Sequence, residues 1–450
     1  MAFLPETVLL VGALLLFLLE LFLERKRVLY VLGGIVALMA AVSLYFAPHP
    51  ADTFYGLFTT YPTAKLFIYI LTALALFSMY AYYEEKGSLY GEVSYLTLMA
   101  SLGLSILVSS NNLGLTFLSL ELSSITLYIL TGTFRGDYPS KEGAYKYLVM
   151  GATGTSLFAL GSAFYYGATG SLYLTNYTQE NSFFTLATFL LLSALALKIS
   201  AVPFHFWTPD AYESAPTPVT GFMATVPKLA VYFFLVKLLS YTSHVKIWMS
   251  VVVILSMLSM LYANFTAYAQ NSVKRLLAYS SIAHAGYFLT GLTVKDPMLQ
   301  KALLFYVIVY SFATLGAFTV LATLEKQENF SHHFLDYVGL GRKRPILAAL
   351  LTLFLMALIG IPPMALFVGK LSLFMGLANV NLMWLALIFA VASVISAGYY
   401  LKVVVYMYMK EEGQKMHSFR LSAGESFVLT VCGLLVLLLG ILPHLVYELL

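Results

Sequence analysis

The sequence has 450 residues, of which 60% are hydrophobic and only 10% are charged, and its mean hydropathy is +0.85. Ordinary soluble domains carry about 25% charged residues, so these values exclude a soluble globular protein and predict an all-α integral membrane protein. The single cysteine, Cys432, excludes disulfides, thiolate-ligated iron–sulfur clusters and CxxC redox motifs within the chain.

Runs of about 20 apolar residues recur along the whole sequence, each long enough to cross a hydrocarbon core of about 30 Å as a helix. The first run has its basic cluster after it and no small-residue cleavage site, so we expect a retained membrane anchor. The connections are short, and even the polar stretch 325–345 is too short for a soluble domain. The runs predict fourteen spans: 5–24, 28–47, 62–83, 93–109, 112–134, 142–168, 182–206, 216–240, 246–268, 276–294, 300–324, 345–376, 380–409 and 422–449.

Basic residues are distributed unevenly between the loops, when each loop is numbered by the helix that it follows. Even loops hold four, namely Lys65, Lys246, Lys295 and Lys301. By the positive-inside rule, this asymmetry predicts that odd loops face the cytoplasm and that both termini face outward. The odd loops hold fifteen basic residues: Arg25, Lys26, Arg27, Lys86, Arg135, Lys141, Lys274, Arg275, Lys326, Arg342, Lys343, Arg344, Lys410, Lys415 and Arg420.

Six lysines fall inside the expected spans, where a charged lysine costs about 3 kcal/mol at the bilayer centre. Lys198, Lys228 and Lys370 lie deepest, and their depth favours a functional role. The other three lie nearer the ends of their spans and can extend to the interface, so that a structural role stays open for them: Lys146, Lys237 and Lys402.

Three further titratable residues accompany these lysines. Glu121 is the one carboxylate near the middle of a span, with a structural ion pair as the alternative reading. His205 follows Lys198 by about two helical turns and would share its face in a continuous helix. A neutral imidazole can pass on a proton near pH 7, so His205 and His284 are candidates for a proton relay, and a role in packing alone is the alternative for each. The other acidic residues of the apolar runs lie near helix ends, where water is close: Glu20, Glu24, Glu325 and Glu425.

Prolines interrupt two of the expected spans close to these lysines. Pro203 follows Lys198, and Pro362 and Pro363 precede Lys370. Proline breaks a helix, and the freed backbone groups are tolerated at membrane depth only where protein or a water-filled cavity satisfies them. We therefore expect hydrated breaks in helices 7 and 12, with titratable groups beside them that form a proton relay.

The two broken helices are five helices apart, which is typical of inverted-repeat transporters with an ion site at the breaks. The expected fold therefore contains two inverted five-helix repeats, helices 4–8 and helices 9–13. Residues 93–240 form the first antiporter-like repeat and residues 246–409 the second. A three-helix segment, 1–92, precedes them, and a C-terminal transmembrane helix, 422–449, follows them.

Four long segments resemble one known family: "KISAVPFHFWTPDAYESAPTPVTGFMATVPKLAVYF", "NSVKRLLAYSSIAHAGYFLTGL", "KEGAYKYLVMGATGTSLFALGSAFYYGATGSLY" and "GIPPMALFVGKLSLF". They are similar to the antiporter-like subunit N (subunit 2) of respiratory complex I, NADH:quinone oxidoreductase, from about residue 112 to residue 410. The resemblance implies a proton-translocating subunit that is driven remotely by quinone reduction. It also implies the inner membrane of a bacterium or archaeon, with both termini on the periplasmic side.

The resemblance also implies roles for single residues. Glu121 resembles the fifth-helix glutamate, and Lys198 the seventh-helix lysine that pairs with it. Lys228 resembles the eighth-helix lysine of the connecting relay, and Lys370 the terminal lysine on the broken twelfth helix. The remaining relay candidates match the family less distinctively: Lys146, His205 and His284.

One departure from the family is "ESAP" at 213–216, where a glycine-containing version is more usual. The resemblance implies no cofactor in this chain, whereas NADH, FMN, iron–sulfur clusters and quinone would belong to partner subunits. Expected partners are the M-type, K-type and neighbouring membrane-arm subunits and the lipid bilayer, with no nucleic acid. The alternative function is a subunit of a multisubunit cation/proton antiporter or of a related membrane-bound hydrogenase or dehydrogenase, which would need the same buried lysines.

Overall fold

The computed structural model describes residues 3–24, 26–47, 61–85, 90–134, 136–177, 179, 181–327, 330–410 and 420–450. Four of the odd-loop basic residues lie outside this part of the chain: Arg25, Lys86, Arg135 and Lys415. Within it, β pairing is limited to two isolated bridges, Asn112 with Tyr173 and Ser272 with His333. The chain is therefore all-helical, as the composition predicts.

Eleven helices in the described ranges are long and apolar enough to cross a membrane. They are α1 (Leu4–Phe22), α2 (Arg27–Ser43), α3 (Pro62–Glu85), α4 (Glu92–Ser109), α5 (Leu113–Thr131), α6 (Tyr138–Thr169), α9 (Thr217–Thr242), α10 (Lys246–Tyr268), α12 (Pro297–Leu324), α16 (Met383–Met409) and α17 (Ala423–Ile441). Because η1 (Leu44–Phe46) continues α2, the second of these spans ends at Phe46.

The remaining helices are shorter or more polar. Three are apolar but short, namely α7 (Ser182–Lys198), α14 (Pro345–Ile359) and α15 (Ala365–Asn379). Every predicted span coincides with a helix or a pair of helices, although fourteen crossings stay a prediction because only eleven meet the length and apolarity requirements alone. The other helices outside the set of eleven are α8 (Trp207–Ser214), α11 (Val273–Thr290), α13 (Leu340–Lys343), α18 (His444–Tyr447) and η2 (Phe334–Tyr337).

Polar side chains and glycines define where several helices begin and end. The Asn112 side chain accepts hydrogen bonds from the amides of Gly114 (2.9 Å) and Leu115 (3.2 Å), which satisfies two free N–H groups at the start of α5. Asp296 does the same for Leu299 (2.9 Å) in α12. At the end of α14, Gly360 adopts a φ of 88°, a left-handed conformation that glycine tolerates.

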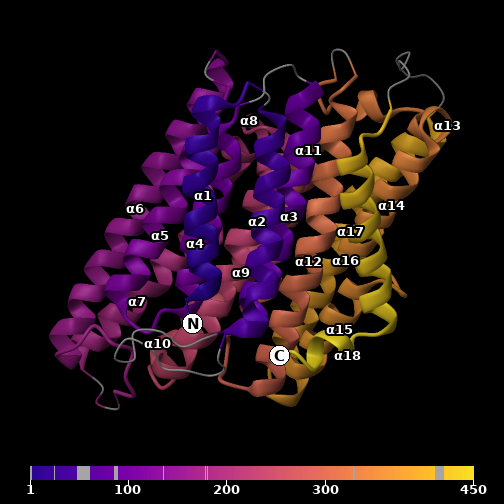
Figure 1. The fold of residues 1–450 in the computed structure, drawn as a ribbon. Helices are drawn as coiled ribbons and strands as arrows, with labels where there is room; N and C mark the ends of the chain where they lie inside the picture. The colour runs from indigo at the N-terminus through magenta and orange to yellow at the C-terminus, as the bar shows by residue number, and fades with distance from the viewer. Residues whose placement is uncertain are drawn as a thin grey trace.

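The helices lie side by side in one bundle, with α9 and α12 packed against each other near its centre (Figure 1). The most apolar stretch of α12 is entirely buried, whereas α1 and α16 bury only about a third of theirs. Outer helices expose large apolar side chains, such as Leu21 and Val394. Such a surface suits a hydrocarbon solvent and would be costly in water.

Both chain ends lie at the same end of the bundle, and α8 and α13 lie at the opposite end (Figure 1). Two basic residues of the odd loops lie at this opposite end, because Arg342 belongs to α13 and Arg275 forms an ion pair with Asp210 of α8. We call this end the odd-loop end.

Candidate functional site

The first interruption of a helix lies directly after Lys198. α7 ends at this residue, α8 begins at Trp207, and Pro203 lies in the non-helical segment between them. Protein groups satisfy backbone atoms that the interruption leaves free. The amide of Val202 donates to the Ser259 hydroxyl (2.9 Å), and the indole N–H of Trp207 donates to the carbonyl of Leu197 (3.3 Å).

Lys198 is bound to α5, the helix that carries Glu121. Its ammonium donates to the Ser124 hydroxyl at 2.7 Å. Glu121 lies one helical turn before Ser124 and accepts a hydrogen bond from Thr155 of α6. Among the ion pairs between described residues none joins Glu121 to Lys198, although the carboxylate charge acts on the ammonium through space. The pair that the resemblance implies is therefore open in this structure.

Lys228 lies at the centre of the bundle, with 1% of its surface exposed. Its ammonium donates to both the carbonyl oxygen (2.8 Å) and the hydroxyl (2.7 Å) of Ser281 on α11. The preceding residue, Pro227, has no N–H for the carbonyl of Met223 one turn earlier, and the hydroxyl of Tyr212 donates to that carbonyl instead (3.3 Å). A proline in α9 thus brings a phenol close to the buried lysine.

His284 lies one turn after Ser281 on α11, between two tyrosines of α12. Its Nδ1 is 3.1 Å from the hydroxyl of Tyr306, and its ring centroid is 4.7 Å from that of Tyr310. The Tyr310 hydroxyl in turn donates to the Ser281 hydroxyl (2.9 Å) that holds Lys228. The fields of Lys370 and Lys228 both reach the imidazole. His284 therefore lies between the two deep lysines.

Lys370 lies at the second helix interruption, between α14 and α15. Its ammonium donates to the last carbonyls of α14, those of Leu358 (3.1 Å) and Ile359 (2.8 Å), and to the Ser393 hydroxyl of α16 (2.8 Å). Helix C-termini leave carbonyls unpaired and favour a cation. Lys370 thus uses all three of its donors and also lies over the Tyr287 ring at 5.1 Å. Pro362 and Pro363 lie in the segment between α14 and α15.

The structure places Lys146 outside the row that Glu121, Lys198, Lys228, His284 and Lys370 form across the bundle. Its side chain is 42% exposed and forms ion pairs with Glu142 and Asp210, both at 2.7 Å. Arg275 pairs with the same aspartate at 2.9 Å. Partial burial raises the pKa of Asp210, but hydrogen bonds and charges from Lys146 and Arg275 outweigh it and lower that pKa. These residues line a charged pocket at the odd-loop end, together with Glu213.

His205 also lies apart from the row. Because α7 ends at Lys198, the two residues do not share a continuous helical face. The imidazole is buried and packs against the rings of Phe206 (4.5 Å) and Tyr262 (4.8 Å). Its Nδ1 has no hydrogen-bond partner among the residues that the structure describes.

The two interior lysines nearest the span ends have partners there. The ammonium of Lys237 donates to the carbonyl of Ser110, directly after α4 (2.7 Å), and to that of Ser109 (3.3 Å). Lys402 lies over the ring of Phe334 in the loop after α12, 4.2 Å from its centroid.

Sequence reasoning missed three buried ionic contacts near helix ends. They join Glu6 to Lys65 (2.6 Å), Glu425 to Lys326 (3.0 Å) and Glu325 to His332 (2.5 Å). Glu325 and Glu425 were expected near water, yet the side chains in all three contacts are at most 11% exposed. A charged residue next to an apolar run can indicate such a pair, but the sequence does not show the partner, which lies up to 99 residues away.

In the described ranges, no group of three or more His, Cys, Asp or Glu side chains is arranged to hold a metal ion. The side chains of the row are instead lysines, hydroxyls, one imidazole and one carboxylate, which exchange protons rather than electrons.

Comparison with known proteins agrees with this geometry. The family described as "NADH:quinone oxidoreductase/Mrp antiporter, TM" matches residues 110–396. A relative named NADH-quinone oxidoreductase subunit N 1, from Aquifex aeolicus (strain VF5), is 54% identical over 453 residues, which cover 99% of this chain and 98% of the relative.

Solved structures show the same architecture. A chain of respiratory complex I from Thermus thermophilus with bound Aureothin has a TM-score of 0.84 and 31% identity, with 99% of this chain and 98% of that chain covered. A chain of the Mrp complex from Dietzia sp. DQ12-45-1b has a TM-score of 0.87 and 20% identity over 99% and 96% of the two chains. At that identity, the second likeness shows a shared fold alone.

The family match spans more than half of the chain, and the most similar of these relatives spans nearly all of it. The resemblance found in the motifs is therefore confirmed. The chain belongs to the NADH:quinone oxidoreductase/Mrp antiporter transmembrane family and, within it, groups with the N subunits of NADH-quinone oxidoreductase.

Proposed function

We propose that this chain is a proton-translocating membrane-arm subunit of a complex I-type NADH:quinone oxidoreductase. The observation that carries the proposal is the row of Glu121, Lys198, Lys228, His284 and Lys370, in which hydroxyls and carbonyls of neighbouring helices hold each ionisable group. Lys228, His284 and Lys370 are buried, and Glu121 and Lys198 are partly buried. The alternative antiporter function shares the fold, but the relative at 54% identity is named as an N subunit and favours the first reading.

The first step is a movement of Lys198 between two groups on α5. In the open arrangement, its ammonium binds the neutral hydroxyl of Ser124. When the side chain moves one helical turn to Glu121, an opposite charge stabilises the ammonium within a medium of low dielectric. Closing the pair therefore loads Lys198 with a proton, and opening it releases that proton toward Lys228.

The second step passes the proton across the middle of the bundle. Lys228 uses two ammonium donors on Ser281, whose hydroxyl also accepts from Tyr310. His284, with Tyr310 on one side and Tyr306 on the other, can take the proton at one ring nitrogen and release it at the other. Lys370 is the final holder, because three acceptors at the second interruption stabilise its charged form.

The proposed architecture has fourteen spans and contains two inverted repeats, whose helices carry the residues of this row. Helices 4–8 are α4 to α9 (within residues 93–240), and helices 9–13 are α10 to α16 (within residues 246–409). An isolated bridge stands at the N-cap of the second helix in each unit, at Asn112 in one and Ser272 in the other. Glu121 and Ser281 stand equally far past these caps, so they occupy equivalent positions in the two units.

The remaining chain comprises the N-terminal segment, 1–92, and the C-terminal helix, 422–449. The common position of both chain ends supports an even number of crossings (Figure 1). The basic residues of the odd loops support an orientation with both ends on the outer side of a bacterial inner membrane. No cofactor binds to this chain in the proposal, and NADH, FMN, iron–sulfur clusters and quinone belong to partner subunits. M-type and K-type subunits would be its neighbours.

The test uses Glu121→Gln, Lys228→Met and the double variant in the assembled complex, reconstituted in vesicles. Each single variant should reduce the number of protons pumped per electron, since one removes the counter-charge and the other a carrier. The double variant should lose little more, because residues that act in one unit are non-additive. Unchanged pumping in Lys228→Met, or fully additive losses in the double variant, would refute the relay.

A further inference from the structure

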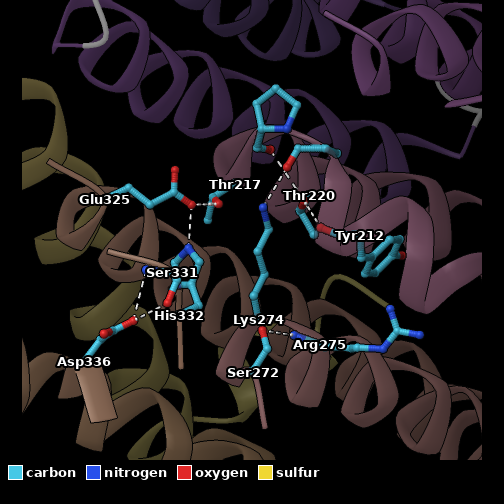
Figure 2. A network of polar contacts seen from close by, with 12 residues as sticks. Tyr212, Thr217, Thr220, Ser272, Lys274, Arg275, Glu325, Ser331, His332 and Asp336 are labelled. Carbon is cyan, nitrogen blue, oxygen red and sulfur yellow. Dashed lines mark hydrogen bonds and ion pairs between the residues drawn. The ribbon is translucent and has the colours of Figure 1, made fainter. Parts of the chain in front are cut away.

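The three helices that surround Lys228 and His284 meet at the odd-loop end in a second polar cluster (Figure 2). Glu325 directly follows α12, Thr217 is the first residue of α9, and Lys274 is the second residue of α11. His332 comes from the loop after α12. Figure 2 shows the Glu325 carboxylate between Thr217 and His332, with Lys274 extended toward the start of α9.

Glu325 and His332 form a buried, directed contact. The Nε2 of His332 is 2.5 Å from a carboxylate oxygen of Glu325, and the hydroxyl of Thr217 donates to the same oxygen. Only 8% and 11% of the two side chains are exposed. The other ring nitrogen, Nδ1, is 3.0 Å from the hydroxyl of Tyr337. Both imidazole nitrogens thus have partners through which a proton can arrive or leave.

The backbone around His332 holds the imidazole in place. The carbonyl of His332 accepts from the amide of Val273 (2.8 Å), at the start of α11. The Asp336 carboxylate accepts from the amides of Ser331 and His333, both at 3.0 Å. His332 itself has a φ of 63°, a conformation that is rare outside glycine and that is kept where surrounding contacts determine it.

The carboxylate remains charged. Burial raises the pKa of Glu325, but the hydrogen bond and charge of His332, the charge of Lys274 and the hydrogen bond of Thr217 outweigh it and hold that pKa well below its usual range. The imidazole is the member of the pair that can pass a proton on, because each of its two ring nitrogens has a partner. Other titratable groups face the cluster from α3 and from the loop after α12: Tyr82, Tyr83, Tyr337 and Asp336. The nearby Lys326 and Glu425 pair with each other.

Polar side chains of α9 and α8 extend from this cluster toward Lys228. Thr217 and Thr220 lie one turn apart on α9, and the Thr220 hydroxyl donates to the carbonyl of Tyr212 (2.8 Å). The Tyr212 hydroxyl donates to the carbonyl of Met223 (3.3 Å), on the same helix as Lys228. Figure 2 shows Thr217, Thr220 and Tyr212 in this order away from Glu325.

We propose that His332, held on Glu325, is a proton-binding site that loads Lys228 from the odd-loop side of the membrane. The proposal rests on the proposed function, because it names where the relay takes up its protons. The proton leaves the imidazolium, moves along the polar face formed by Thr217, Thr220 and Tyr212, and binds the neutral amine of Lys228. The imidazole then takes a new proton from the odd-loop solution, so the cycle needs no oxidant or reductant at this site.

The test uses His332→Gln in the assembled complex in vesicles. Glutamine keeps a side-chain N–H for Glu325 but binds no proton near neutral pH. Proton pumping per electron and the amount of assembled complex are measured over a series of pH values. We expect the proton-transfer rate to fall by about 100-fold, the lower end of the effect of a positioned acid–base group, and the amount of assembled complex to stay unchanged.

Glu425→Gln is the matched control. It removes a buried carboxylate at the same end of α12 whose partners are Lys326 and Thr323 rather than groups of α9 or α11, so pumping should stay normal. Equal losses in the two variants, or less complex with unchanged protons per electron, would overturn the proposal as merely structural. Normal pumping in His332→Gln beside lost pumping in Lys228→Met would overturn this inference alone, whereas normal pumping in Lys228→Met would overturn the proposed function as well.

Discussion

Replacing Ser124 by alanine should shift the position of the Lys198 side chain from Ser124 toward Glu121. In the structure the Lys198 ammonium binds the Ser124 hydroxyl at 2.7 Å and makes no ion pair with Glu121, as judged over the described residues. Without that hydroxyl, the open position of Lys198 loses its acceptor. The side chain should then remain on Glu121, which keeps the proton bound.

The size of this bias follows from the bond that is lost. A hydrogen bond to a charged group contributes about 1.5–3 kcal/mol, and each 1.4 kcal/mol is about a tenfold change in an equilibrium. The closed position should therefore gain roughly 10- to 100-fold in population over the open one. If opening of the pair limits proton release, the pumping rate should fall by a similar factor.

The assay is the rate of proton pumping by vesicles that contain the assembled Ser124→Ala complex. Ser123→Ala is the matched control, because Ser123 is also buried on α5 but donates to the carbonyl of Leu120 rather than accepting from a lysine. The control should pump at the normal rate. A normal rate in Ser124→Ala, or an equal loss in both variants, would show that Ser124 is not the open position of Lys198.

Two further predictions concern the odd-loop end. Because the pKa of Asp210 is lowered, its ion pairs with Lys146 and Arg275 stabilise the protein at neutral pH and are lost as pH falls through that lowered value, below about pH 4. Asp210→Asn should therefore weaken the fall of the unfolding temperature at acid pH. An unchanged fall would contradict the assignment. Leu335 is 67% exposed, whereas the native Cys432 is buried. A cysteine at position 335 should therefore react with a membrane-impermeant label in inside-out vesicles but not in intact cells, and labelling of intact cells would reverse the orientation.

The deep lysines and the helix interruptions were predictable because both violate the rules of an apolar helix. A charge such as Lys370 and a proline such as Pro203 stand out in an apolar run without any knowledge of their surroundings. The structure adds the physical link between the two features. Lys370 binds the carbonyls that the end of α14 leaves free, so that each feature stabilises the other.

Contacts between distant segments could not be predicted in the same way. The expected alignment of His205 with Lys198 assumed a continuous helix, and the end of α7 removes that alignment. Glu325 and His332 lie close in sequence, but their burial depends on α9 and α11, which cover them. The surroundings of Lys146 likewise depend on Asp210, which belongs to a different helix.

The central claim is that protons cross this chain along the row from Glu121 to Lys370, and Lys370 tests it most directly as the last holder. The measurement is the number of protons that vesicles with the assembled Lys370→Met complex move per electron, with Lys402→Met as the control lysine that lies over Phe334 outside the row. The account predicts a lower ratio in Lys370→Met and an unchanged ratio in the control. An unchanged ratio in Lys370→Met would contradict it.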